Sequence, residues 1–145
     1  TDDRIREVQR TIKMQAYLFI LGEKFNCWSE LESLLRNQSQ SLILTETSTV
    51  PDSFKFSVLK TGQNDSEIYT FLHNTCTEVV IVESELTNAL LRKFVSKAKS
   101  RLRSIVHINP DEKYNDKVRR HELWWDVPAA EGLRKLAECV EKKIS

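Results

Sequence analysis

The sequence predicts an α/β domain in which about five or six strands form a single mixed sheet with helices packed on it. Two β-branched runs, Val79–Val82 and Ile105–Ile108, are separated by a segment of helix length. A continuous apolar run of strand length is typical of a strand covered on both faces. Strand-type and helix-type segments also alternate along the rest of the chain. We therefore expect a strand–helix–strand crossover over residues 77–108, right-handed if its strands share a sheet.

The middle of this crossover has the pattern of an amphipathic helix over residues 86–103. At 100° per residue its apolar side chains fall in one half of the helical wheel. Three basic residues cluster on the opposite side: Arg92, Lys99 and Arg103. The pattern indicates a core-facing helix with a basic outer surface.

Three elements are expected at the start of the chain. Asp2 or Asp3 can cap a first helix, whose apolar residues recur at helical spacing up to Ile12. A dense apolar run at 14–21 follows and predicts a strand that ends at Gly22. Next, Ser29 and Glu32 have the spacing of a capping box. The helix that they begin would be buried through Trp28, Leu31, Leu34 and Leu35.

The segments 41–46 and 54–59 are strand candidates, and the Pro51-Asp52 turn signal between them predicts a hairpin with a long loop. Asp65 or Ser66 then opens a short helix. After the crossover, the charged connector 112–120 leads to a strand at 121–127 and a final amphipathic helix at 129–145. Gly132 lies in the first turn of that helix, where glycine costs about 1 kcal/mol relative to alanine.

Composition excludes several classes of protein. The 145 residues carry a net charge of +1, so a global electrostatic footprint for nucleic acid is absent. No apolar run approaches the ~20 residues of a membrane-spanning helix. The three cysteines are an odd number without metal-ligand spacing, which favours free thiols and an intracellular protein, cytoplasmic or nuclear.

We expect one domain over residues 1–145. The chain begins at Thr1 without a methionine, so we interpret it as a fragment of a larger protein. Processing or removal of a tag would give the same start.

Motifs for catalysis and for cofactor binding are missing from the sequence. The only glycines, Gly22, Gly62 and Gly132, are far apart, whereas phosphate-binding loops need several close together. The cysteines lack a nucleophile signature. His107 falls within a predicted strand, where a hydrogen-bonded structural histidine is the more common case. We therefore expect no cofactor and no bound metal, and a non-enzymatic function more than an enzymatic one.

One enzymatic alternative stays open at Glu83, where the run 79–82 ends and the helix begins. Ligands of open α/β sheets bind beyond the carboxyl ends of the strands. A divergent or degenerate nuclease-like or nucleotide-type enzyme would place Glu83 there beside a second acid or a histidine. Asp52, Asp111 and Lys113 have the wrong spacing for the acid and lysine set of a nuclease.

The alternative that ranks ahead of this enzyme is a nucleic-acid-binding module that uses the helix 86–103 and the connector 112–120. Such a surface would contact phosphates and bind with steep salt dependence. The basic helix has no interleaved aromatic residues for base stacking, and a solvated helix face explains the same pattern. The candidate contacts are Arg92, Lys99, Arg103, Lys117, Arg119 and Arg120.

The preferred function is a non-catalytic protein–protein interaction or dimerisation module of a larger protein. Its candidate surface is the segment HELWWDV with Trp124 and Trp125. Neighbouring residues of a strand point to opposite faces, so only one of the two tryptophans can face a given core. Tryptophan is enriched at interface hot spots. We expect the partner to be another protein or a second copy of this chain, and no membrane.

Overall fold

The protein was analysed as a computed structural model, which describes residues 16–36, 40–47, 49–60, 62–84, 92–93, 104–120 and 122–144. The side chains of residues 139–144 are not described. The predicted first helix and most of the helix 86–103 lie outside the described residues. Within them, no helix is long and apolar enough to cross a membrane.

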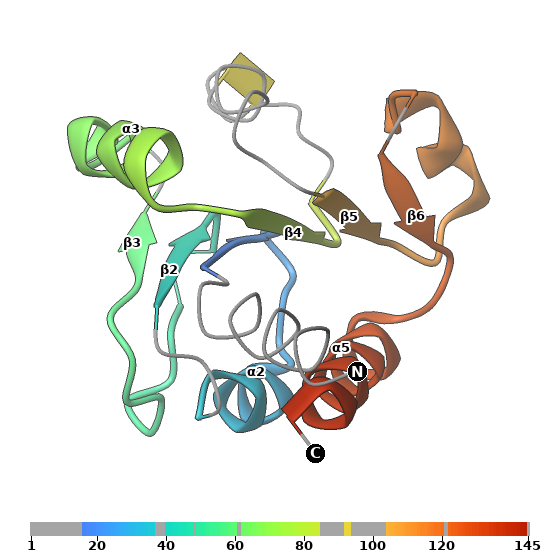
Figure 1. Cartoon of the computed structure of the whole chain (residues 1–145), viewed down its shortest axis with the longest axis horizontal. Coiled ribbons are helices and arrows are strands. Elements are labelled where there is room, and N and C mark those ends of the chain that lie inside the picture. Colours follow the sequence, from blue (N-terminus) through green and yellow to red (C-terminus); the bar gives the residue numbers. More distant parts are fainter. Residues whose placement is uncertain are drawn as a thin grey trace, which may run out of the picture.

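A six-stranded sheet forms the centre of the molecule (Figure 1). Its spatial order is β3-β2-β1-β4-β5-β6, and every neighbouring pair is parallel. The α/β class predicted from the sequence is confirmed, with a sheet that is all-parallel rather than mixed. The strands are β1 (Tyr17–Leu21), β2 (Ser41–Thr45), β3 (Leu59–Lys60), β4 (Glu78–Val82), β5 (Ser104–Ile108) and β6 (Leu123–Trp125).

Helices cover both faces of this sheet. In Figure 1, α2 and α5 lie on one side of the strands and α3 lies on the other. The strands β4 and β5 are parallel neighbours, and the intervening Arg92 and Lys93 are helical, in agreement with the predicted crossover. The helices are α2 (Trp28–Leu35), α3 (Asp65–Asn74), the 3₁₀ helix η1 (Glu112–Lys117) and α5 (Ala129–Ile144).

The two cores follow from the alternation of side chains along each strand. In β1 all five residues are buried, because both faces of this central strand are covered. Tyr17, Phe19 and Leu21 contact the core under α2 and α5. Leu18 and Ile20 contact the core under α3. This continuous apolar run therefore marks a strand covered on both faces, as the sequence predicts.

The predicted hairpin is wrong. β3 contains only Leu59 and Lys60, and it pairs in parallel with β2. The alternating residues before it serve a different purpose: the Phe54 ring lies 5.0 Å from the Trp28 ring of α2 in an edge-to-face arrangement. The period of two thus arises from aromatic packing of a loop on a helix.

The predicted capping box is also wrong. Ser29 lies inside the first turn of α2 and its hydroxyl donates to Glu30, while Cys27 occupies the cap position without a side-chain hydrogen bond.

The strand order places a topological switch point between β1 and β4. From β1 the chain proceeds to β2 and β3 on one side, and from β4 it proceeds to β5 and β6 on the other. This is the order of doubly wound folds, in which ligands bind beyond the carboxyl ends of the strands at the switch point. Gly22 and Glu83, which follow β1 and β4, lie at this switch point.

Gly132 has a packing role that explains a glycine in the first turn of α5. A Cβ atom at this position would overlap the side chain of Ile108 in β5. Helix α5 can lie this close to the sheet only because the side chain is absent.

We predict that Gly132→Ala destabilises the protein by about 1–3 kcal/mol, although alanine is the better helix former. The measurement is urea unfolding. The exposed α5 variant Glu138→Ala serves as control and should change the free energy of unfolding by less than about 0.5 kcal/mol. A gain in stability for Gly132→Ala would contradict this packing account.

Candidate interaction edge

The carboxyl ends of β1 and β4 pack directly on each other at the switch point. The backbone N–H of Gly22 donates to the carbonyl of Val82 at 2.9 Å. A Cβ atom at Gly22 would overlap the carbonyl oxygen of Glu83, so only glycine permits this approach. The backbones of the two strand ends are therefore in direct contact.

Glu83 has an unusual backbone conformation and is held by two hydrogen bonds. Its backbone is left-handed, with φ of 50°, a conformation that costs a side-chain-bearing residue energy. Its N–H donates to the carbonyl of Ile108 at 2.8 Å, and its Oε1 accepts from the N–H of Ala129 at 3.2 Å. Ala129 begins α5, and a helix N-terminus attracts negative charge. The carboxylate of Glu83 thus occupies the anion-binding position of α5.

The neighbouring polar groups do not assemble a catalytic cluster. Glu46, which follows β2, accepts a hydrogen bond from the hydroxyl of the buried Ser84 at 2.8 Å. Among the described residues, no group of three or more His, Cys, Asp and Glu side chains could hold a metal ion. Burial raises the pKa of the Cys27 thiol, and it raises the pKa of the Cys76 thiol to about 12. Both thiols therefore stay protonated near neutral pH.

A buried network of polar side chains lies on the α3 side of β5. His107 is fully buried, and its ring nitrogens lie 2.7 Å from the hydroxyl of Tyr114 and 2.7 Å from Oε1 of Glu122. Arg92 pairs with the same carboxylate oxygen at 3.2 Å. Because an ionised carboxylate only accepts, Nε2 of His107 carries the proton and Nδ1 accepts from Tyr114. The network joins the helical residue Arg92, β5, η1 and the start of β6.

Burial and charge fix the ionisation states in this network. Burial lowers the pKa of His107 below its ordinary 6.5, although the hydrogen bond and the charge of Glu122 act in the opposite direction. Burial alone would raise the pKa of Glu122, but the N–H of Arg119 and the side chains of His107 and Arg92 outweigh it and lower that pKa. A neutral histidine therefore donates to a carboxylate. The bonded arrangement indicates a structural role for His107, the one expected from the sequence.

The strand β6 forms one edge of the sheet, and its three residues have different environments. Trp124 donates its Nε1–H to the carbonyl of Asn109 at 3.0 Å and is half-buried. Trp125 packs against the core under α5, with the Lys135 ammonium 5.9 Å from its ring centroid. The described residues contain two large apolar side chains that are exposed, Phe56 and Leu123. Leu123 is the more exposed of the two, at 52%. We call the three residues of β6 the β6 edge.

Both tryptophans of the sequence prediction therefore lie on the β6 edge, but each also supports the fold. Leu123 was missed by the sequence analysis. It shares a face with Trp125 because the two are two residues apart in a strand. Its exposure depends on β6 being the last strand of the sheet, which no local pattern specifies.

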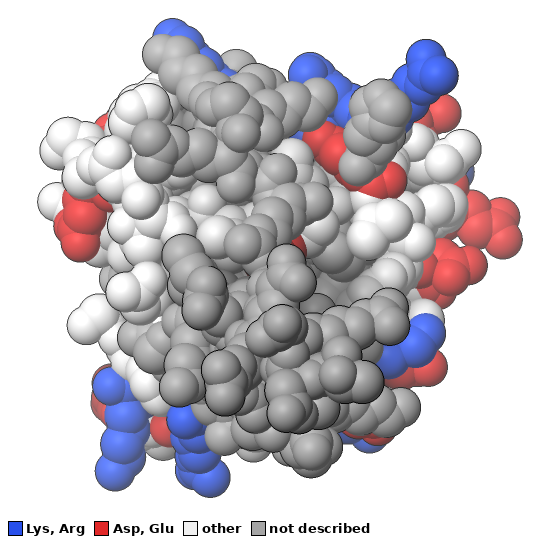
Figure 2. Space-filling model, viewed as in Figure 1, with Lys and Arg blue, Asp and Glu red and all other residues white. Residues whose placement is uncertain are grey.

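The six basic residues predicted to contact nucleic acid do not come together as one described group. Arg92 is engaged with Glu122 and its side chain is only 16% exposed. Arg119 and Arg120 are exposed and Lys117 is half-buried, while Lys99 and Arg103 lie outside the described residues. On the face seen in Figure 2, the described Lys and Arg side chains lie in separate groups at the rim with Asp and Glu between them. Nucleic-acid binding stays a prediction.

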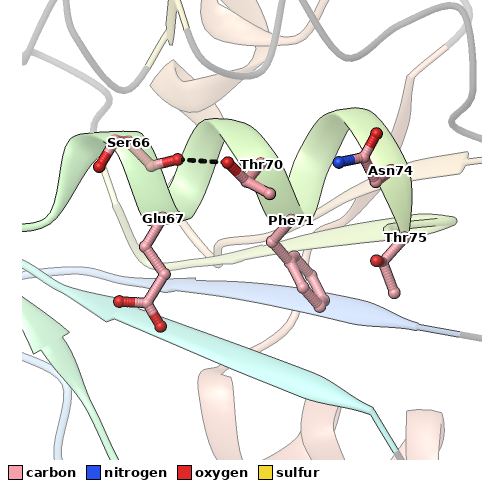
Figure 3. Close-up of a pocket in the computed structure, with 6 residues that line it drawn as sticks. All are labelled: Ser66, Glu67, Thr70, Phe71, Asn74 and Thr75. Atoms are coloured by element: carbon pink, nitrogen blue, oxygen red, sulfur yellow. Dashed lines mark hydrogen bonds between the residues drawn. The ribbon is translucent and has the colours of Figure 1, made fainter.

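A shallow groove of about 430 Å³ runs along the exposed side of α3 (Figure 3). Its described lining comes from two rows of that one helix, with Ser66, Thr70 and Asn74 in one row and Glu67, Phe71 and Thr75 in the other. The hydroxyl of Thr70 donates to the carbonyl of Ser66 at 2.8 Å. Glu67 is the only charged side chain of this described lining, so the groove brings no catalytic pair together.

Comparison of the chain with protein-family models and with curated proteins finds no match. The interpretation of the site therefore depends on its geometry.

We predict that the His107 network makes stability depend on pH. The folded state disfavours protonation of His107, whereas the unfolded chain takes up this proton near pH 6.5. The contribution of His107 to stability is therefore complete above pH 6.5 and is lost as the pH falls below it. The lowered pKa of Glu122 adds a further loss below its ordinary value of 4.5.

Urea unfolding at a series of pH values between about 7 and 5 tests this behaviour. His107→Gln should remove most of the decline in this range. The control His73→Gln, at an exposed position of α3, should keep it. An unchanged decline in His107→Gln would assign the pH dependence to other groups.

Proposed function

We propose that this domain is a non-catalytic protein–protein interaction module of an intracellular protein, and that it binds its partner through the β6 edge. The observation that carries the proposal is the 52% exposure of Leu123 on a terminal strand beside two half-buried tryptophans. Interfaces draw most of their binding energy from a few large side chains in a partly desolvated setting.

The non-catalytic part of this proposal is supported by the Glu83 carboxylate, which occupies the N-terminus of α5 at the carboxyl edge of the sheet. A nucleotide at the switch point needs a free helix N-terminus and room for phosphate. Here the Glu83 carboxylate accepts from the first N–H of α5, and the backbone of Gly22 contacts that of Glu83. At the N-terminus of α5, a phosphate would have to displace this carboxylate of like charge. The free thiols Cys27 and Cys76 support the intracellular part of the proposal.

The structure also decides which residue is the best probe of the β6 edge. Replacing Trp124 removes the hydrogen bond to Asn109, and replacing Trp125 opens the core under α5. Either change weakens the fold as well as a binding surface. Leu123 is exposed by more than half, so its replacement tests binding with little effect on stability.

We predict that a photo-crosslinking phenylalanine derivative at Leu123 forms a covalent adduct with one defined protein in cells that express the parent protein. Phe56, the second exposed large apolar side chain, provides the matched control position. It lies in the loop before β3, at the opposite edge of the sheet.

The readout is mass spectrometry of the adducts, with the crosslinked peptide mapped on both proteins. An adduct specific to position 123 is expected. Absence of any adduct at 123, or the same set of adducts at 56 and 123, would contradict the proposed function.

A further inference from the structure

We infer that the partner of the β6 edge is a second copy of this chain, bound by antiparallel pairing of the two β6 strands about a two-fold axis at Trp124. This inference rests on the proposed function and names its partner.

Among the described residues, nothing pairs with the outer side of β6, where its backbone presents one donor and one acceptor. The carbonyl of Trp125 accepts from the N–H of Asn109 at 3.1 Å, so Trp125 directs its backbone groups toward β5. In a parallel ladder, alternate residues of a strand bond to the same neighbour. The N–H and C=O of Trp124 therefore point away from β5.

A two-fold axis at Trp124 satisfies both groups at once. In an antiparallel pair, two directly opposed residues of the hydrogen-bonded type exchange both N–H···O bonds. Trp124 of one copy and Trp124 of the second copy would form such a pair. The arrangement is isologous and closed, so it yields a dimer rather than an open fibre.

The same register makes the exposed side chain self-complementary. With Trp124 opposite Trp124, Leu123 of each copy lies directly opposite Trp125 of the other. Directly opposed side chains have Cβ atoms about 4.5–5.5 Å apart and contact each other. Both exposed leucines would leave water, each against a tryptophan ring that is already held by its own core.

Charges at the two ends of β6 select the antiparallel direction. The exposed Arg119 and Arg120 precede the strand, and the exposed Asp126 follows it. In this register, Asp126 of one copy lies diagonally from Arg120 of the other, at both ends of the pair. Directly opposite Asp126 is Glu122, whose carboxylate is already engaged by Arg92 and His107 within its own copy. Parallel pairing of two copies would place like charges together, which disfavours it.

Short edge strands limit unwanted pairing, and β6 has only three residues. We therefore expect a reversible dimer whose population depends on protein concentration. This length also explains why side chains and flanking charges, rather than a long ladder, have to define the register.

Sedimentation velocity of the chain over a range of concentrations tests this inference, with a monomer–dimer equilibrium as the expected result. Leu123→Asp should weaken the dimer by about tenfold or more, because it places a carboxylate against a tryptophan ring. The matched control Phe56→Asp should leave the dissociation constant unchanged.

A charge exchange tests the direction of pairing. Arg120→Asp alone and Asp126→Arg alone should each weaken the dimer by about threefold or more, and the double variant should restore it. A monomer at all concentrations, or a dimer that Leu123→Asp leaves unaffected, would overturn the inference. So would a double variant no tighter than the single ones.

These outcomes are distinguishable from failure of the proposed function. A monomeric chain that still forms a specific adduct with a different protein at position 123 overturns the self-association and keeps the β6 edge as the binding surface. A monomeric chain without such an adduct overturns both.

Discussion

The position of Glu83 is the constraint on which the carboxyl edge of this sheet depends. One residue closes the ends of three elements: its carbonyl contacts Gly22 after β1, its N–H bonds to β5, and its carboxylate caps α5. Glu83 makes these contacts with a left-handed backbone, a conformation that costs about 1–2 kcal/mol for a residue with a side chain. The doubly wound strand order remains, and at the carboxyl edge of the sheet the N-terminus of α5 is capped by the chain itself.

The β6 edge lies at one side of the sheet, formed by its last strand. The His107 network anchors the start of β6, because Glu122, the residue before this strand, bonds to His107 and Arg92. An isolated three-residue strand would be poorly ordered. Here a buried charge pair at its start and the Trp125 ring at its end hold it against β5.

Much of the fold could be predicted because its main signals are local. The run from Val79 to Val82 and the dense apolar segment before Gly22 are continuous because both faces of central parallel strands are buried. The alternation before Leu59 was misleading, since packing of Phe54 on Trp28 produces the same period as a half-buried strand. The candidate site was only partly predictable. The sequence singled out both tryptophans, but the exposure of Leu123 and the partners of His107 depend on strand order and on contacts between distant segments.

The most direct test of this account is the free energy of unfolding of two variants at Glu83. Glu83→Ala loses the cap on α5 and keeps the cost of a left-handed residue, so it should destabilise the protein by about 0.5–2 kcal/mol. Glu83→Gly loses the same cap but adopts positive φ freely, so it should be more stable than Glu83→Ala by about 1 kcal/mol. Equal stabilities, or a more stable alanine variant, would show that Glu83 is not held in the conformation that closes the switch point.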